Sequence, residues 1–245
     1  MTITSQQNEK LKQLRKLARR DMRTRADAFI AEGEDLLAAA DAAGWVPVER
    51  YCAAGSGLVG QEVEPKLLAA VSQLGSGTRT LAVYRQRWAG AVTGPLCVAL
   101  HGIADPGNVG TVLRSALAFG AASVAFGPGC ADPYGPKAVR ASMGAIFAVA
   151  KARFVCIDEL PGTKVGLDAH GAEALEGWPG GRPKPLTLLI GAERAGLPDD
   201  VLAACDRVAR IPIHSESLNA AMAATVALYE VTRETVSAEH RMPSA

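Results

Sequence analysis

The sequence lacks the features that mark secreted, membrane-spanning and metal-binding proteins. Its five cysteines stand singly, with no pair at the spacing of a zinc or redox motif. The first ten residues are polar and no apolar run approaches about 18 residues, so we expect neither a secretion signal nor a membrane span. The four histidines are dispersed without ligand spacing, which gives metal-dependent chemistry no support. These absences favour a reducing, cytoplasmic setting without a metal.

Motifs of several common enzyme classes are also missing. Gly129 and Gly135 are too far apart for a phosphate-binding loop, and Pro136 stands where that loop needs a lysine. No G-x-G-x-x-G follows a predicted strand, and no G-x-S-x-G elbow is present. Nucleotide hydrolysis, ordinary dinucleotide binding and serine-hydrolase chemistry are therefore disfavoured.

What is present is ordinary globular material. The 245 residues are 49% hydrophobic and 21% charged, which suits one large domain or two modest ones. The formal net charge is only +1. A nucleic-acid partner would therefore have to be bound by a local basic patch rather than by the field of the whole molecule.

A basic patch of this kind is predicted near the N-terminus. Residues 5–25 have helical periodicity, with Leu11, Leu14, Ala18 and Met22 on one narrow arc. Eight lysines and arginines between positions 9 and 25 oppose only two acidic residues. Such a run usually marks a solvated helix face, but its asymmetry favours contacts with RNA phosphates. The candidate RNA-binding residues are Lys12, Arg15, Lys16, Arg19 and Arg23.

The chain is predicted to form two α/β domains. Residues 1–84 contain predicted helices at 34–43 and 65–74 and predicted strands at 45–52 and 80–84. Residues 85–95 are basic, lack a clear period and are punctuated by glycine and proline, as a linker would be. Residues 96–245 form the second predicted domain.

The second domain alternates strand and helix patterns. Continuous apolar runs predict buried parallel strands, and the regular alternation predicts a mainly parallel sheet with helices on both faces. In such sheets the ligand site lies outside the carboxyl ends of the strands. Predicted strands occupy 96–100, 122–126, 154–157, 186–190 and 208–211, and predicted helices occupy 109–119, 137–147 and 201–204, with a last helix after Asn219.

Three polar turns follow apolar strands in this domain. They are residues 105–108 together with Arg114, residues 191–197, and residues 211–219. Any one of them could be a structural turn or a helix cap, and Asn108 is well placed to cap the helix that follows it. Their shared position at strand ends favours a common functional site.

These turns resemble a known family. The stretch Asn108-Val-Gly-Thr-Val-Leu-Arg114, the turn that starts Gly191-Ala-Glu193, and Ile211-Pro-Ile with Ser217-Leu-Asn219 are similar to three motifs of the SpoU–TrmH RNA ribose 2′-O-methyltransferases. Residues 137–144 are similar to the stretch between the first two motifs. Residues 96–236 resemble the catalytic domain, and residues 8–37 resemble the small ribosomal-protein-L30e-like substrate-binding domain.

The resemblance implies a fold, a reaction and residue roles. We expect a trefoil-knotted α/β domain that binds S-adenosylmethionine, works as a homodimer and methylates a ribose 2′-OH, most simply in ribosomal RNA. The expected catalytic residue is Arg114, oriented with the RNA by Asn108, Glu193, Ser217 and Asn219. The expected cofactor contacts are Leu189, Gly191, Ile211, Ile213 and Leu218.

Some alternatives stay open at this level. Arg114 could act as a base assisted by a substrate phosphate, or bind that phosphate and stabilise developing negative charge. The substrate could be transfer RNA instead. The loop of residues 214–216 is two residues shorter than is usual in the family. A non-catalytic RNA-binding or ribosome assembly factor with a knotted domain is the alternative that this shorter loop suggests.

Overall fold

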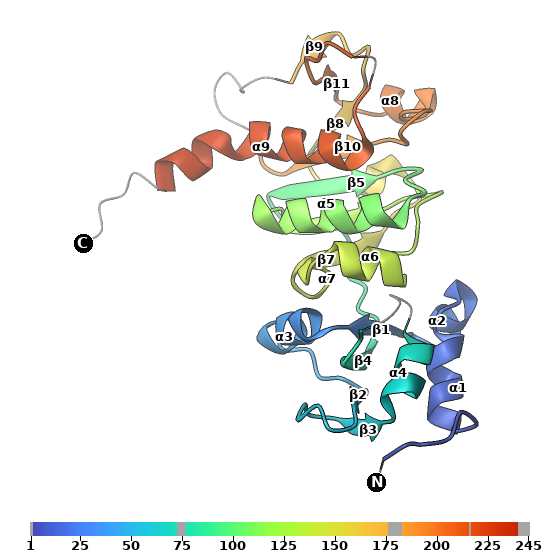
Figure 1. Ribbon diagram of the computed structural model, residues 1–245. Helices are drawn as coiled ribbons and strands as arrows, with labels where there is room; N and C mark the ends of the chain where they lie inside the picture. The colour runs from blue at the N-terminus through green and yellow to red at the C-terminus, as the bar shows by residue number, and fades with distance from the viewer. Residues whose placement is uncertain (1, 73–76, 176–182, 216, 240–245) are drawn as a thin grey trace. The chain divides into compact units, whose positions relative to one another are not determined.

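The computed structural model describes residues 2–72, 77–175, 183–215 and 217–239 and divides into two compact units (Figure 1). Unit 1 comprises Met1–Arg87 and Asp132–Ala148. Unit 2 comprises Trp88–Ala131 and Val149–Ala245. None of the helices in the described ranges combines the length and hydropathy needed to cross a membrane.

Unit 1 is built on a four-stranded sheet in the order β1-β4-β2-β3. β1 (Ala28–Glu32) and β2 (Glu49–Ala53) are both antiparallel to β4 (Thr80–Arg85). β3 (Gln61–Val63) is parallel to β2 and forms an edge of the sheet. The helices are α1 (Glu9–Lys16), α2 (Arg20–Ala26), α3 (Glu34–Ala42), α4 (Pro65–Val71), α6 (Pro136–Ala141) and α7 (Ala145–Ala148).

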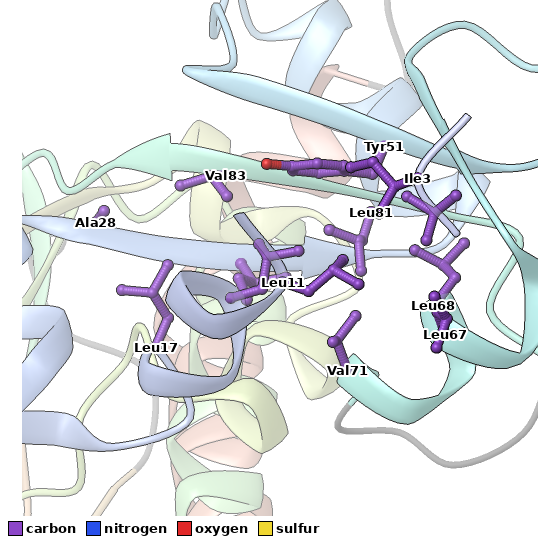
Figure 2. Packing of buried hydrophobic residues seen from close by; sticks show 13 residues of the cluster. Ile3, Leu11, Leu17, Ala28, Tyr51, Leu67, Leu68, Val71, Leu81 and Val83 are labelled. Carbon is purple, nitrogen blue, oxygen red and sulfur yellow. The ribbon is translucent and has the colours of Figure 1, made fainter. Parts of the chain in front are cut away.

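An apolar cluster joins the N-terminal helices of unit 1 to this sheet. Leu11 of α1 and Leu68 of α4 are fully buried, as are Tyr51 and Leu81 of the sheet. Figure 2 shows these side chains gathered between the helices and the strands. Burying several large side chains at about 1.5 to 3 kcal/mol each supplies much of the free energy that holds α1 and α4 in place.

The basic N-terminal segment is not the single helix that its periodicity predicts. α1 ends at Lys16, and Arg19 is extended (φ −89°, ψ 135°) before α2 begins. The Arg23 guanidinium donates hydrogen bonds to the carbonyls of Leu17 (2.9 Å) and Ala18 (2.7 Å). Carbonyls at a helix end have no partner within the helix, so this side chain stabilises the break. Leu17, rather than Ala18, is the buried residue here.

Residues 132–148 also depart from the predicted domain order, because their contacts place them in unit 1. Phe29 packs against Tyr134 with ring centroids 4.7 Å apart, and the Trp45 indole donates to the Phe147 carbonyl at 2.9 Å. Contacts between aromatic residues so distant in sequence produce no local sequence pattern. The prediction from sequence therefore assigned this segment to the second domain. The predicted helix over 137–147 is divided into α6 and α7.

Unit 2 is built on a seven-stranded sheet in the order β7-β6-β5-β10-β8-β11-β9, and every neighbouring pair is parallel. This confirms the predicted mainly parallel α/β architecture. The strands are β5 (Leu96–Leu100), β6 (Ser123–Phe126), β7 (Ala150–Arg153), β8 (Thr163–Leu167), β9 (Glu173–Ala174), β10 (Leu186–Ile190) and β11 (Arg207–Arg210).

Helices cover this sheet. α5 (Pro106–Ala118) packs beside α9 (Ala220–Glu239), and α9 also packs against β10 (Figure 1). α8 (Asp199–Ala203) adds Val201 to an apolar cluster that includes Cys97, Ala99 and Leu189 of the sheet. A short 3₁₀ helix (Ile157–Glu159) adds Ile157 to the same cluster.

Two details of unit 2 differ from the predictions. In place of the strand predicted at 154–157, the structure has β7, which ends at Arg153. The β7 sequence contains two basic residues, and one of them, Lys151, is buried. β8 and β9 were not predicted, because their short, partly polar stretches lack a continuous apolar run. The expected trefoil knot and the L30e-like character of unit 1 stay predictions.

Candidate active site

The three polar turns meet at the carboxyl edge of the unit 2 sheet. β5 and β10 are neighbours in register, with Leu100 opposite Ile190. The turn before α5 and the turn at Gly191 therefore leave the sheet side by side. β11 follows across β8, so the turn at Ile211 leaves the same edge.

Side chains from all three turns form one hydrogen-bond chain. The Asn219 Nδ2 atom donates to Asn108 Oδ1 at 3.2 Å, and the Asn108 Nδ2 atom donates to Glu193 Oε1. Asn219 also caps α9, because its Oδ1 atom accepts from the backbone N–H of Ala221 (3.0 Å) and Met222 (3.3 Å). Asn108, Glu193 and Asn219 come from segments up to 111 residues apart, and the structure brings them together as one group.

Asn108 is not the helix cap that was predicted. The N-cap of α5 is Asp105, whose Oδ1 atom accepts from the Asn108 backbone N–H at 3.1 Å. Pro106 occupies the first helical turn, where its missing N–H costs nothing. Because Asp105 takes the capping role, the Asn108 carboxamide is free to join the hydrogen-bond chain.

Arg114 and Ser217 lie apart from that chain. Arg114 lies on α5, six residues beyond Asn108, and its exposed side chain has no hydrogen-bond or ion-pair partner among the described residues. Ser217 is also exposed, and its carbonyl accepts from the Ser215 hydroxyl at 3.3 Å. Glu216, which separates Ser215 from Ser217 in the shortened loop, lies outside the described residues.

A cavity of about 520 Å³ adjoins the hydrogen-bond chain. Its size is within the range of about 300 to 1,000 Å³ that is typical of small-molecule sites. Four of the five predicted cofactor residues line it, namely Gly191, Ile211, Ile213 and Leu218. Glu193 and Ser217 line it as well. The cavity therefore joins the second and third polar turns.

Leu189 is the predicted cofactor residue that does not line this cavity. Its side chain is fully buried in the cluster with Cys97, Ala99 and Val201. Side chains of a strand alternate between its two faces, so the neighbouring Ile190 lines the cavity instead. The prediction for Leu189 is corrected on this ground.

Gly191 is required by the close approach of its own turn. A Cβ atom at Gly191 would lie 2.2 Å from the carbonyl carbon of Gly196. Ala192 and Gly196 exchange both backbone hydrogen bonds, at 3.0 and 2.9 Å, and Gly196 has a positive φ of 66°. These constraints fix the backbone that presents Glu193.

Part of the cavity wall lies on a turn that the sequence does not single out. Asp168 and His170 follow β8 and line the cavity beside Ala169. The rule that located the other turns, a polar turn at the end of a parallel strand, applies to them too. The sequence does not reveal this turn, because β8 lacks the continuous apolar run that identifies its neighbours β5 and β10.

The basic residues of unit 1 differ in accessibility. Lys16 and Arg19 are exposed, while Lys12 and Arg15 are half-buried. Lys12 pairs with Glu9 (2.7 Å), Arg19 pairs with Asp21 (3.0 Å), and Arg15 donates to the Gln6 carbonyl (3.2 Å). All four lie on or beside α1.

Arg23 is wrongly predicted as an RNA-binding residue. It is only 4% exposed, and its guanidinium binds Asp132 Oδ2 at 2.7 Å in addition to the two carbonyls near α1. A buried and fully engaged guanidinium cannot reach a phosphate without breaking unit 1 open. Its role is structural.

A parallel α/β unit with a small-molecule cavity and a polar cluster at the carboxyl ends of its strands defines a ligand-binding or catalytic domain. The model of the SpoU rRNA Methylase family matches residues 95–229, more than half of the chain. The chain belongs to this family.

Individual relatives match to different extents. A 23S rRNA (uridine(2479)-2′-O)-methyltransferase of Streptomyces viridochromogenes is 37% identical over 147 residues, covering 54% of this chain and 50% of the relative. The chain thus spans about half the length of this relative. The Bacillus subtilis 23S rRNA (guanosine(2553)-2′-O)-methyltransferase RlmP is 26% identical over 246 residues, covering 94% of this chain and 98% of the relative.

Solved structures match nearly the whole chain. An AdoMet-bound rRNA methyltransferase from Sinorhizobium meliloti superposes with a TM-score of 0.86 at 28% identity, covering 96% of this chain and 98% of that one. The SpoU methyltransferase AviRb from Streptomyces viridochromogenes, in complex with AdoMet, gives 0.83 at 29% identity and covers 94% and 99%.

Proposed function

We propose that this protein is an S-adenosylmethionine-dependent RNA methyltransferase that transfers a methyl group to a ribose 2′-OH, in ribosomal RNA. One observation carries the proposal. Glu193 belongs both to the hydrogen-bond chain with Asn108 and to the wall of the cavity. A small-molecule site and a polar cluster able to position a hydroxyl therefore share one side chain. The relatives named as 23S rRNA 2′-O-methyltransferases support the same reaction.

The cavity suits the proposed cofactor in size and chemistry. S-adenosylmethionine has an adenine ring and an aliphatic chain, which need apolar walls, and polar groups that need hydrogen-bond partners. Ile190, Ile211, Ile213 and Leu218 supply apolar surface. Asp168, Glu193 and Ser217 supply acceptors, and the tight Gly191 turn brings main-chain groups to the wall. When bound, the cofactor supplies an activated methyl group, so no metal is required.

Arg114 is proposed to act on the RNA. An arginine stays protonated in proteins, so its most direct role is to bind a substrate phosphate and stabilise negative charge that develops on the 2′-oxygen. Its exposed guanidinium has no partner among the described residues and is free for such a contact. Asn108, Glu193 and Asn219 hold one another and would position the ribose.

We also propose that the site is completed in a homodimer. α5 and α9 expose a strip of large apolar side chains, formed by Leu117, Met222, Val226 and Tyr229. The two helices are fixed together by the Ser115–Thr225 hydroxyl contact of 2.6 Å and the Phe119–Tyr229 ring contact. Arg114 lies one turn from Leu117, so a second copy covering the strip would reach it. Val226→Glu should shift the protein to monomers in sedimentation experiments and lower methyl transfer with it.

Ribosomal RNA is favoured over transfer RNA by the names of the relatives, although one Mycobacterium tuberculosis relative, 34% identical, is named only as a tRNA/rRNA methyltransferase. The exposed cations around α1, chiefly Lys16 and Arg19, are proposed to bind RNA phosphates. Lys12 and Arg15 would contribute after exchanging their present partners.

The decisive experiment is methyl transfer from labelled S-adenosylmethionine to unmodified ribosomal RNA and, separately, to transfer RNA. The expected result is label in a 2′-O-methyl nucleoside from ribosomal RNA. Label only on transfer RNA would correct the substrate. Tight RNA binding without transfer to either RNA would overturn the enzymatic proposal in favour of a non-catalytic binding factor.

A further inference from the structure

The turn after β8 presents a carboxylate to the cavity that no part of the family resemblance assigns. Asp168 lines the cavity and is half-buried. Its Oδ1 atom accepts from the His170 backbone N–H at 2.8 Å. No described residue donates to its Oδ2 atom. Because Asp168 lines the cavity, this oxygen without a donor is an acceptor for whatever occupies the cavity.

This carboxylate is held in place by a rigid turn. The Asp168 backbone N–H donates to the Ala209 carbonyl at 3.0 Å, and the Asp168 carbonyl accepts from Gly171 at 3.1 Å. The Arg210 guanidinium donates to the carbonyls of Gly171 (2.7 Å) and Ala172 (2.9 Å). The two ends of the turn are therefore tied to β11, so Asp168 is positioned before a ligand arrives.

The Oδ2 atom lies beside the second polar turn. A Cβ atom placed on Gly196 would be 3.6 Å from it, an ordinary contact distance. β8 and β10 are neighbours in the sheet, so Asp168 follows one parallel strand while the Gly191 turn follows the next. Dinucleotide-binding sheets use a comparable arrangement, in which an acidic residue near a strand end accepts hydrogen bonds from a ribose.

We propose that Asp168 binds the ribose hydroxyls of the cofactor. This inference rests on the proposed function. The positively charged sulfur is a poorer candidate partner, because a carboxylate fixed against it would stabilise the ground state and lose that interaction as the methyl group leaves. Hydroxyl groups are unchanged by the reaction, so binding them holds the cofactor without opposing transfer.

The test crosses protein variants with ligand variants. Calorimetry would measure binding of S-adenosylhomocysteine and its 2′-deoxy and 3′-deoxy analogues to the wild-type protein and to Asp168→Asn, which keeps an acceptor for His170. We expect at least one missing hydroxyl to weaken wild-type binding by about 10- to 100-fold, as for hydrogen bonds to a charged group. Asp168→Asn should bind the parent ligand equally weakly and be insensitive to that missing hydroxyl.

Other outcomes would overturn the inference. Asp168→Asn could bind the parent ligand more weakly and still lose as much affinity as the wild type when the hydroxyl is missing. In that case the carboxylate binds another group, such as the ammonium of the amino-acid end. Unchanged affinity in Asp168→Asn would remove it from the site. Wild-type protein that binds neither S-adenosylmethionine nor the product would overturn the proposed function itself. Asp158→Asn, an exposed carboxylate of unit 2 outside the cavity, is the matched control.

Discussion

The two groups of polar residues that the sequence singled out behave differently. In unit 2, residues from three separate turns meet at one edge of a parallel sheet, where Asn108, Glu193 and Asn219 bind one another. In unit 1, the cations of one continuous segment are divided between two helices. Some are paired on the surface, and Arg23 is buried against Asp132.

The difference has a physical origin. Parallel strands all point the same way, so the topology of the sheet brings their carboxyl ends together whatever the sequence distance. No comparable rule determines whether a charged side chain stays free at the surface. It depends on which carboxylate happens to fold against it, and Asp132 is 109 residues away from Arg23.

The largest effect is expected at Arg114. Arg114→Ala should lower methyl transfer by about 100- to 1,000-fold, as loss of a group that stabilises developing charge does. Calorimetry should show unchanged cofactor binding, since Arg114 does not line the cavity. Arg153→Ala, an exposed arginine of β7, is the control. Activity of Arg114→Ala within threefold of wild type would refute the proposed role.

Arg23 should show the opposite pattern, a large effect on stability. Arg23→Ala leaves Asp132, whose side chain is only 13% exposed, without its ion-pair partner. Removal of one partner of a buried ion pair typically lowers the free energy of unfolding by about 3 to 5 kcal/mol. Hydrogen exchange of α2 and of residues 132–148 should report the loss. Arg19→Ala, whose side chain is 72% exposed, should leave exchange nearly unchanged. Similar exchange in both variants would contradict the burial of Arg23.

A smaller effect is expected from Gly191→Ala. The added methyl group would overlap the backbone of Gly196 and force the turn apart. Overpacking of this kind lowers the free energy of unfolding by about 1 to 3 kcal/mol. The midpoint temperature of thermal unfolding should fall, and S-adenosylmethionine should bind more weakly. Gly90→Ala, where nothing lies within 4 Å of the added atom, is the matched change. Wild-type binding by Gly191→Ala would mean that this turn is not part of the cofactor site.

The smallest effect is expected from the basic residues on and beside α1. Changing Arg15, Lys16 and Arg19 together to Glu should weaken RNA binding and flatten its salt dependence by roughly one unit of slope per lost phosphate contact. S-adenosylmethionine binding should be unaffected. Lys66→Glu, an exposed cation on α4, is the control. Unchanged RNA affinity in the triple variant would make α1 an ordinary solvated helix.

Prediction from sequence succeeded where the signal was local or periodic. β5 and β10 were located at both ends, because continuous apolar runs identify strands that are buried on both faces. α5 was found from its apolar stripe, although its start lies at Pro106 and its cap is Asp105. β8 was missed because Lys164 and Gly166 interrupt its apolar pattern, and Asp168 was missed along with it.

The sequence by itself determined the parallel α/β class, the three strand-end turns and several of the residues around the cavity, because strand periodicity and turn chemistry depend on neighbouring residues. Only the tertiary structure decided that residues 132–148 belong to unit 1, that Arg23 is buried, that Ile190 and not Leu189 faces the cavity, and that Asp168 joins it. Most of these outcomes depend on contacts between residues far apart in the chain, and no local pattern records which distant partner a side chain will meet.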